Sequence, residues 1–316
     1  MISKEVLLNC CQRIQPFIHN TPILSSKSID QKIGASIFFK CENFQRAGSY
    51  KIRGATNAIL QLSQEQKYNG VVTHSSGNFA QALSLAAQSI GIPAHIVMPS
   101  SAPHIKKEGV LSYGGKIYEC APTVEARQKK ANEIAAKTGA TFIHPSNETE
   151  VIIGQGTAAY ELLQVHPDLD IVFCPIGGGG LIAGTALYAN YFSNTCMVIG
   201  GEPFEADDAY RSLKSGSIES NTTVNTIADG LKTTLGDKNF PIIKKHVSKI
   251  VRVTEGEIID AMRLVWERMK IIIEPSSAVA LAALIRDAQE NKDMYKNRKV
   301  GVIISGGNVD LDNLPF

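Results

Sequence analysis

The sequence lacks the features that mark membrane-spanning, secreted and nucleic-acid-binding proteins. Its 32 basic and 30 acidic residues are mixed along the chain and leave a net charge of only +2. No basic face therefore indicates a nucleic acid or an anionic membrane as partner. The apolar run near the amino terminus, Val6 to Leu8, is far shorter than a signal-peptide core or a membrane span. We expect a cytoplasmic protein that acts on a small molecule.

Cysteine is scarce and shows no ligand spacing. The six cysteines form no CxxC or Cys/His motif, and several lie in apolar, strand-like runs: Cys10, Cys11, Cys41, Cys120, Cys174 and Cys196. This distribution favours buried thiols over a redox role.

The chain also has no repeat, low-complexity tract or long linker. Short apolar, β-branched runs instead alternate with amphipathic stretches, a pattern that indicates βαβ units and a parallel sheet. The expected strands are 36–41, 71–73, 95–98, 116–120, 141–144, 171–176, 197–200, 250–254 and 300–305. The expected helices include 79–90, 124–137, 156–164 and 256–270.

A chain of 316 residues is long enough for roughly two domains. Consecutive strand-helix units between about residues 70 and 146 are sufficient for a small sheet of their own. Because no long linker flanks this block, we expect an inserted domain with short connections. Residues 1–69 and 147–316 are then expected to form one large domain, and residues 70–146 a small one.

Four consecutive glycines, Gly177 to Gly180, stand between an apolar strand ending at Ile176 and an apolar helix opening at Leu181. Residues without side chains let backbone N–H groups close on an anion, and a helix amino terminus adds positive potential. This arrangement favours a phosphate site over a simple flexible turn.

A dinucleotide site is the main alternative at this loop. Gly178, Gly180 and Ala183 match the G-x-G-x-x-A fingerprint, and Glu202 follows at about the distance of a ribose-binding acid. In dinucleotide folds this loop normally belongs to the first βα unit, whereas many expected strands precede it here. The loop alone leaves NAD open, and the other motifs have to decide.

Lys51 is the candidate reactive amine. It lies in the segment GSYKIRGA, Gly48 to Ala55, beside an aromatic residue, among small residues and at the start of a helical pattern. A confined, partly apolar setting lowers the pKa of an amine and makes it nucleophilic. A solvated surface lysine is the alternative.

Two further polar turns follow expected strands. The segment HSSGN, His74 to Asn78, leads into a helix and offers hydroxyl and N–H donors for a substrate carboxylate. A plain helix cap is the alternative there. The segment SGGN, Ser305 to Asn308, follows the last strand, and its alternative is a tight turn.

In this order and spacing, the four motifs resemble those of the fold-type II pyridoxal-phosphate enzymes, in particular the serine racemase and serine/threonine dehydratase branch. The resemblance extends from about Thr21 to Asp310, and the segment LVWERMK, Leu264 to Lys270, is similar to eukaryotic-type serine racemases. It implies a tryptophan synthase beta-like α/β fold with two open, mostly parallel twisted sheets and helices on both faces. It also implies that the block 70–146 is a mobile domain that closes over the substrate.

The resemblance implies a cofactor-binding set. Lys51 resembles the lysine that holds pyridoxal 5'-phosphate as a Schiff base and acts as a base on one face of the substrate carbon. Asn78 is expected to bind the phenolic oxygen, Tyr50 to lie near the ring and Ser305 to contact the pyridine nitrogen. A hydroxyl at that place need not keep the nitrogen protonated. The phosphate-binding residues are expected to be Gly177, Gly178, Gly179 and Gly180.

Ser76 is similar to the racemase serine that faces the substrate from the side opposite the lysine. Inverting a carbon needs one group that removes a proton and another, on the far face, that returns one. We therefore expect Lys51 and Ser76 to be the catalytic pair of a serine racemase that also converts serine to pyruvate and ammonia. The expected substrate-binding residues are Ser75, Ser76, Asn78 and Arg127.

A second activity remains open on the same scaffold. It is an ammonia-lyase for L-serine, L-threonine or threo-3-hydroxyaspartate without significant racemisation, because β-elimination needs only the lysine and a protonated leaving hydroxyl. Where the family usually has histidine after Ser-Gly-Asn, this chain has Phe79, and Tyr50 replaces a frequent phenylalanine. Phe79 removes a polar group near the substrate and leaves the substrate preference open.

The resemblance also implies a cation, an effector and a dimer. Glu202, Ala206 and Asp208 resemble the divalent-cation site of this branch, with two carboxylates and one carbonyl for Mg²⁺ or Ca²⁺. An exposed acidic loop is the alternative. A nucleotide effector such as ATP is expected between the subunits of a homodimer. Its candidate residues are Gln81, Tyr113, Lys270 and Asn308.

Overall fold

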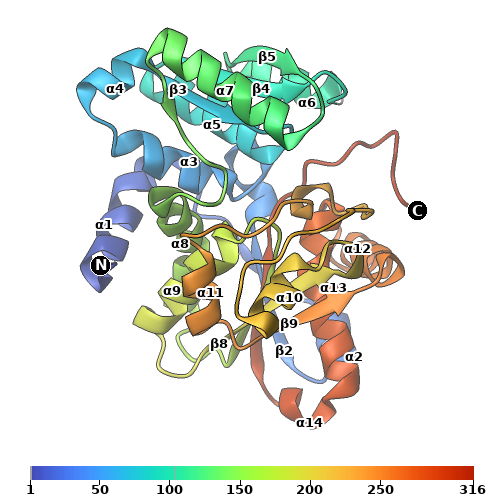
Figure 1. Cartoon of the computed structure of the whole chain (residues 1–316). Helices are drawn as coiled ribbons and strands as arrows, with labels where there is room; N and C mark the ends of the chain where they lie inside the picture. Colours follow the sequence, from blue (N-terminus) through green and yellow to red (C-terminus); the bar gives the residue numbers. More distant parts are fainter. Residues whose placement is uncertain (1, 103) are drawn as a thin grey trace.

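The structure, a computed structural model, describes residues 2–102 and 104–316 (Figure 1). Its larger sheet has six strands in the order β1-β2-β10-β7-β8-β9, and all neighbours are parallel except β1 and β2. These strands are β1 (Ile23–Leu24), β2 (Ser36–Cys41), β7 (Ile171–Pro175), β8 (Met197–Pro203), β9 (Lys249–Val253) and β10 (Lys299–Ile304).

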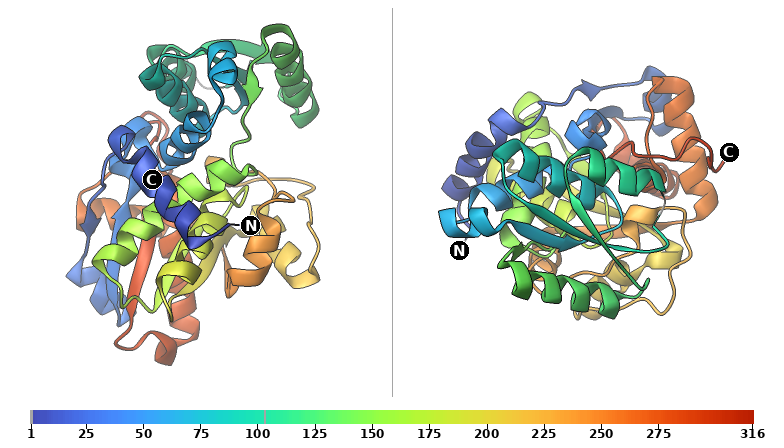
Figure 2. Two further views of the ribbon diagram at one scale, coloured as in Figure 1. Left: turned by 90° about the vertical axis from the view of Figure 1, so that its left-hand side faces the viewer. Right: turned by 90° about the horizontal axis from the view of Figure 1, so that it is seen from above.

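A second, fully parallel sheet has the order β5-β4-β3-β6. Its strands are β3 (Val71–His74), β4 (Ala94–Pro99), β5 (Lys116–Cys120) and β6 (Thr141–Phe142), and the helices between them are α5 (Asn78–Ile90), α6 (His104–Ser112) and α7 (Val124–Thr138). We call these elements the small lobe and the remainder the large lobe. Figure 2 shows the small lobe standing above the large lobe.

Helices cover both faces of the large sheet. Side chains of β7 alternate between two apolar clusters, because successive strand residues point to opposite faces: Ile171 and Phe173 lie in one cluster, and Val172 and Cys174 in the other. The first cluster includes residues of α2 (Lys27–Ile33), α12 (Glu255–Met269) and α13 (Pro275–Glu290). The second includes residues of α1 (Lys4–Ile14), α8 (Thr149–Val165), α9 (Gly180–Phe192), α10 (Asp208–Ser215) and α11 (Phe240–His246). Burial on both faces explains why these strands are continuous apolar runs.

Helix α3 (Lys51–Leu60) packs between the lobes. Its residues Ile52 and Ile59 share an apolar cluster with Phe79 and Leu83 of α5. On the other side, a Cβ on Gly54 would lie 2.7 Å from the carbonyl oxygen of Val151 in α8. The apolar core of the small lobe therefore extends beyond residues 70–146. Two shorter α-helices are also present, α4 (Gln64–Asn69) before β3 and α14 (Lys292–Tyr295) before β10.

The α/β fold with two mostly parallel sheets is confirmed, and each expected strand is present with ends that differ by a few residues. Strand β1 was not expected, since two residues carry no periodicity. Helix α8 begins at Thr149, well before the expected start at residue 156. Its first turns are buried on nearly all sides, so the sequence shows no polar face there.

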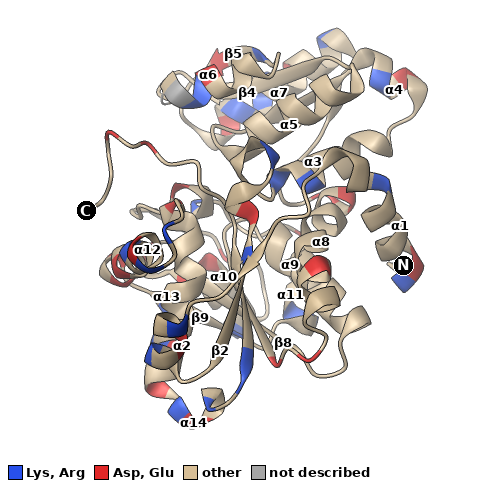
Figure 3. Cartoon of the chain, turned by 180° about the vertical axis from the view of Figure 1, so that it is seen from behind, with Lys and Arg blue, Asp and Glu red and all other residues tan. Residues whose placement is uncertain are grey.

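The distribution of charged residues in the structure agrees with the small net charge of the sequence. Basic and acidic residues are interspersed over both lobes on the face drawn in Figure 3. In the part of the chain that the structure describes, we find no helix with the length and apolarity needed to span a membrane.

Candidate active site

The four sequence motifs meet at the carboxyl ends of parallel strands. Ser305 follows β10, and its carbonyl accepts a hydrogen bond of 3.0 Å from the backbone N–H of Tyr50, the residue before Lys51. Asn308 donates from Nδ2 to Oδ1 of Asn78 at 3.0 Å, which joins the motif after β10 to the motif after β3. This edge of an open α/β sheet is where ligands bind in such folds.

Lys51 is the first residue of α3, and its amine is confined. Its Nζ donates to the carbonyl of Pro145 at 3.1 Å and lies 5.0 Å from the ring centre of Tyr50 and 5.9 Å from that of Phe79. Burial lowers the pKa of Lys51 from 10.5 to about 8, against an opposing effect of the Glu274 carboxylate. A lysine with this pKa is partly neutral near pH 7 and is a competent nucleophile and base.

A buried ion network fixes the helix that carries Lys51. Arg53 is fully buried and donates from Nε to Glu42 at 2.6 Å and from Nη1 to Glu161 at 2.7 Å. Lys40, also fully buried, pairs with Glu161 at 2.6 Å. Because a buried charge without partners is costly, this network holds the start of α3 in one place.

The glycine loop forms a tight cradle between β7 and α9. Gly179 has φ +79°, a left-handed conformation that disfavours other residues, and it caps α9. A Cβ on Gly178 would lie 2.4 Å from Oγ of Ser146, and one on Gly180 would lie 2.4 Å from Oε1 of Gln155. Backbone N–H groups at a helix amino terminus have no intrahelical acceptors, so this loop can bind an anion. A Cβ on Gly177 would likewise lie 2.6 Å from Leu231.

Glu202 does not behave as a ribose-binding acid. It is fully buried on β8, and its two oxygens accept N–H bonds from Ala209 at 2.9 Å and Tyr210 at 2.8 Å. The glycine loop follows β7 in the middle of the large sheet rather than a first strand. Both observations count against the dinucleotide alternative.

Asn78 belongs to a buried polar network that the sequence did not predict. Its Nδ2 donates to Glu274 Oε1 at 2.9 Å and Oε2 at 3.0 Å. Glu274 is buried before α13, and its burial and the nearby Asp229 raise its pKa to about 8. Asn308, a candidate effector residue, also donates to the carbonyl of Ala47 at 2.8 Å. The sequence signal available for Glu274 was the proline that follows it, because proline often occupies the first position of a helix.

The segment 144–147 between the lobes also reaches this site. The carbonyl of Pro145 accepts from both Lys51 and Gln155. His144 accepts at Nδ1 from the backbone N–H of Asn147 at 2.8 Å, and burial together with the charges of His74 and Lys51 lowers its pKa to about 4. His144 is therefore neutral at physiological pH.

The expected substrate residues lie on the small lobe. Ser75 and Ser76 form the turn between β3 and α5, half-buried, and Oγ of Ser75 accepts from the N–H of Gly77 at 3.3 Å. Phe79, which follows this turn in α5 and is 2 % exposed, has its ring centre 5.9 Å from the amine of Lys51. Arg127 lies on α7 and donates from Nε to the carbonyl of Thr123 at 3.3 Å, one turn earlier. Its role at the substrate stays a prediction.

The expected cation residues are adjacent. Asp208 begins α10 and accepts from Asn221 Nδ2 at 2.7 Å and from the N–H of Leu235 at 3.2 Å. Burial and the charge of Asp208 raise the pKa of Glu202, and burial raises that of Asp208 to about 6. The third candidate, Ala206, ends a short helical turn just before α10 and is buried. Among the described residues, no group of three or more His, Cys, Asp or Glu side chains is placed to hold a metal. The predicted cation site falls below that number, because it contains two carboxylates, Glu202 and Asp208, and one backbone carbonyl.

The candidate effector residues fall on both lobes. Gln81 lies on α5 against α6, since a Cβ on Gly109 would lie 2.7 Å from its Oε1. Tyr113 follows α6 and packs on the small-lobe core. Lys270 ends α12 with φ +58°. The structure contains one chain, so a site between subunits stays a prediction.

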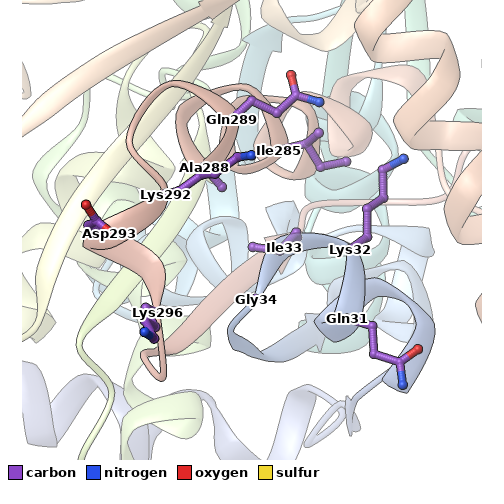
Figure 4. Close-up of a pocket in the computed structure, with 10 residues that line it drawn as sticks. All are labelled: Gln31, Lys32, Ile33, Gly34, Ile285, Ala288, Gln289, Lys292, Asp293 and Lys296. Carbon is purple, nitrogen blue, oxygen red and sulfur yellow. The ribbon is translucent and has the colours of Figure 1, made fainter.

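The pocket in Figure 4 is separate from this site. It has a volume of about 320 Å³ and lies where β2 and β10 begin, at the opposite edge of the large sheet. Its lining residues are Gln31, Lys32, Ile33, Gly34, Ile285, Ala288, Gln289, Lys292, Asp293 and Lys296. None of the expected site residues is among them.

Comparisons with known proteins agree with this geometry. The chain is 47 % identical to a beta-hydroxyaspartate dehydratase of Paracoccus denitrificans, over 99 % of this chain and 98 % of that protein. It is 48 % identical to a serine racemase of Dictyostelium discoideum, over 96 % and 94 %. The structure of maize serine racemase superposes with a TM-score of 0.95 at 45 % identity, covering 97 % of this chain and 93 % of that one. The model of the family described as pyridoxal-phosphate dependent enzyme matches residues 14–306. The chain therefore belongs to the pyridoxal-phosphate dependent enzymes of fold type II.

Proposed function

We propose that this enzyme is a serine racemase that interconverts L- and D-serine and also eliminates water from serine to give pyruvate and ammonia. The proposal depends on one pairing, Lys51 and Ser76. Lys51 begins α3, Ser76 lies in the turn before α5, and the ring centre of Phe79 in α5 lies 5.9 Å from the amine of Lys51. Relatives named serine racemase, 48 % identical in one case, support it.

The residues present fit pyridoxal 5'-phosphate. The glycine cradle at α9 has no room for a side chain and suits a phosphate. The amine of Lys51 is confined, and the residue before it, Tyr50, donates its backbone N–H to the carbonyl of Ser305, a buried residue. When bound, the cofactor supplies an electron sink that stabilises negative charge on the α-carbon of an amino acid.

The side chains then divide the proton transfers. With a pKa of about 8, the amine of Lys51 removes or returns a proton on one face of the α-carbon. The hydroxyl of Ser76 serves the other face, while N–H and hydroxyl groups of the β3–α5 turn hold the substrate carboxylate. Elimination uses Lys51 alone, together with a protonated leaving hydroxyl.

The Ser76→Ala variant tests the pairing. In the holoenzyme with L-serine and Mg²⁺, we expect D-serine formation to disappear while part of the pyruvate release remains. Equal loss of both activities would contradict the two-base scheme. Ser89→Ala is a matched control, because Ser89 lies at the far end of α5 and its hydroxyl donates to the carbonyl of Leu85.

A second candidate is an ammonia-lyase for L-serine, L-threonine or threo-3-hydroxyaspartate without significant racemisation. Phe79 favours it, because this buried apolar ring lies beside Lys51. The relative named beta-hydroxyaspartate dehydratase, at 47 % identity, also favours it. Rapid keto-acid release from threo-3-hydroxyaspartate without D-serine from L-serine would establish this candidate instead.

Further features of the proposal concern binding and assembly. The buried carboxylates of Glu202 and Asp208, with the carbonyl of Ala206, would hold Mg²⁺ or Ca²⁺. ATP would bind as an effector between the subunits of a cytoplasmic homodimer. Residues 70–146 would close as a small domain over the substrate, and the ion pair between Lys106 of α6 and Asp229 already joins the lobes.

A further inference from the structure

Gln155 is a fully buried glutamine in α8, and its amide lies close to the reactive lysine. Its Nε2 donates to the carbonyl oxygen of Pro145 at 3.1 Å, and Nζ of Lys51 donates to the same oxygen at 3.1 Å. A carbonyl oxygen has two lone pairs, so these two donors fill its capacity. This shared acceptor connects Lys51 to a residue that no sequence motif identified.

The orientation of the Gln155 amide is fixed by its partner. The carbonyl oxygen of Pro145 can only accept a hydrogen bond, so the nitrogen of the amide has to face it. The opposite orientation would place two acceptor oxygens 3.1 Å apart. Packing also confines the side chain, because a Cβ on Gly54 would lie 2.8 Å from its Cγ and one on Gly180 would lie 2.4 Å from its Oε1. Gln155 is therefore held between α3 and α9.

Packing alone does not explain an amide at this position. Among the residues that the structure describes, Oε1 of Gln155 has no hydrogen-bond partner although it is buried. A buried acceptor without a partner is destabilising, and an apolar side chain of similar length, such as methionine, would avoid this penalty. What distinguishes the amide from such a side chain is the N–H that it donates to Pro145.

The acceptor that Gln155 shares with Lys51 belongs to the segment 144–147 between the lobes. Gln155 attaches this segment to α8 of the large lobe. Asn239 attaches it to the large lobe a second time, because its Nδ2 donates to the carbonyl of Ser146 at 3.1 Å. These two contacts keep the oxygen of Pro145 in the frame of the large lobe, which also carries Lys51.

We propose that Gln155 is a positioning residue that holds the carbonyl of Pro145 as the acceptor for the Lys51 amine whenever this amine is not bonded to the cofactor. The inference rests on the proposed function, in which the free amine of Lys51 transfers a proton at the α-carbon. A neutral amine has two protons and one lone pair. While Pro145 holds one proton, the lone pair and the second proton stay available to the reacting atoms, and each transfer starts from one position of the amine.

The first part of the test measures turnover of the holoenzyme with L-serine. We expect Gln155→Met to lower kcat for D-serine and for pyruvate at least about fivefold and to change KM little, because the position of the amine affects the chemical step rather than substrate binding. Gln164→Met is the matched control, since Gln164 is an exposed glutamine near the end of the same helix. It should match wild type.

The second part measures the attachment of pyridoxal 5'-phosphate to the cofactor-free protein by stopped-flow absorbance as a function of pH. Gln155→Glu places a carboxylate next to the amine of Lys51 and favours the protonated amine, so the midpoint of the rise in rate should move upward by about one pH unit or more. Gln164→Glu should leave the midpoint unchanged. Two other ionisable groups near the amine, Glu274 and His144, are the same in all variants, so a difference between variants comes from residue 155.

Two results would overturn the inference alone, in a wild-type protein that is yellow and active. One is a Gln155→Met enzyme with the kcat of the control, or with a loss that appears only in KM. The other is a Gln155→Glu protein with the wild-type midpoint, and this result is decisive even if Gln155→Met does not fold. A wild-type protein that forms no yellow complex overturns the proposed function as well, which separates the two failures.

Discussion

The glycine cradle gives the sharpest prediction, through the substitution Gly179→Ala. The residue has φ +79°, and a left-handed conformation costs a residue with a side chain about 1–2 kcal/mol. The added Cβ would also lie 2.6 Å from Cδ2 of Leu235 and 2.8 Å from Oδ1 of Asn239. Overpacking of this kind typically adds about 1–3 kcal/mol.

The overlap with Asn239 affects binding as well as stability. Nδ2 of Asn239 donates to the carbonyl of Gly178 at 2.7 Å and to that of Ser146 at 3.1 Å, so it holds the loop against the lobe-connecting segment. A shift of Asn239 moves the N–H groups that would bind the phosphate. We expect the variant to lose about 2–5 kcal/mol of unfolding free energy and at least about tenfold in cofactor affinity.

The assay has two parts: urea unfolding of the cofactor-free protein, and titration with pyridoxal 5'-phosphate followed by absorbance. Gly256→Ala is the matched control, because a Cβ there meets nothing within 4 Å. It should leave affinity unchanged and stability within about 1 kcal/mol. A Gly179→Ala protein with wild-type stability and affinity would refute the cradle.

Further predictions follow from the ionisable groups. Lys51→Ala should abolish the yellow complex and all turnover, as an absorption spectrum would show; a yellow, active variant would contradict the assignment. Because burial depresses the pKa of Lys51 to about 8, the neutral amine increases as pH rises through that value. Attachment of the cofactor should therefore speed up to about pH 8 and level off above it, as stopped-flow absorbance would measure, and a flat profile would count against the confined amine. Arg53→Met leaves Glu42 buried without its partner and should cost about 3–5 kcal/mol in urea unfolding, whereas Arg286→Met, at a partly exposed pair, should cost less than about 1 kcal/mol. Mg²⁺ should raise the melting temperature of the protein, and this rise should become smaller as pH falls through about 6, because Asp208 then takes up a proton. The Asp208→Asn variant should show no rise with Mg²⁺. An unchanged rise in that variant would exclude the site.

The sequence predicted the parts of the site that depend on local order. A strand followed by glycines and then a helix is visible in a one-dimensional pattern, and the structure places Gly177 to Gly180 in that arrangement. Lys51 at a helix start was predictable for the same reason, because small and aromatic neighbours are close in sequence.

The remainder depends on tertiary packing. Glu274 lies far in sequence from Asn78 and meets the site only because α13 packs beside β10. Pro145 and His144 reach Lys51 because the chain crosses between the lobes there. Among these residues, only Glu274 has a local sequence signal, the proline that follows it.

The packing of α3 on the small lobe was hidden for a related reason. The expected boundary at residue 70 follows strand periodicity, which begins at β3. Side chains of α3 nevertheless complete the apolar core of that lobe, since Ile52 and Ile59 pack on α5. These contacts cannot be read from strand periodicity, and the predicted domain boundary at residue 70 stays a prediction.

The most direct measurement of the central claim is to incubate the holoenzyme with L-serine and Mg²⁺ and to quantify D-serine and pyruvate in the same sample. Lys51 and Ser76 acting on opposite faces predict substantial D-serine together with pyruvate. Pyruvate without D-serine would contradict the racemase and leave an ammonia-lyase.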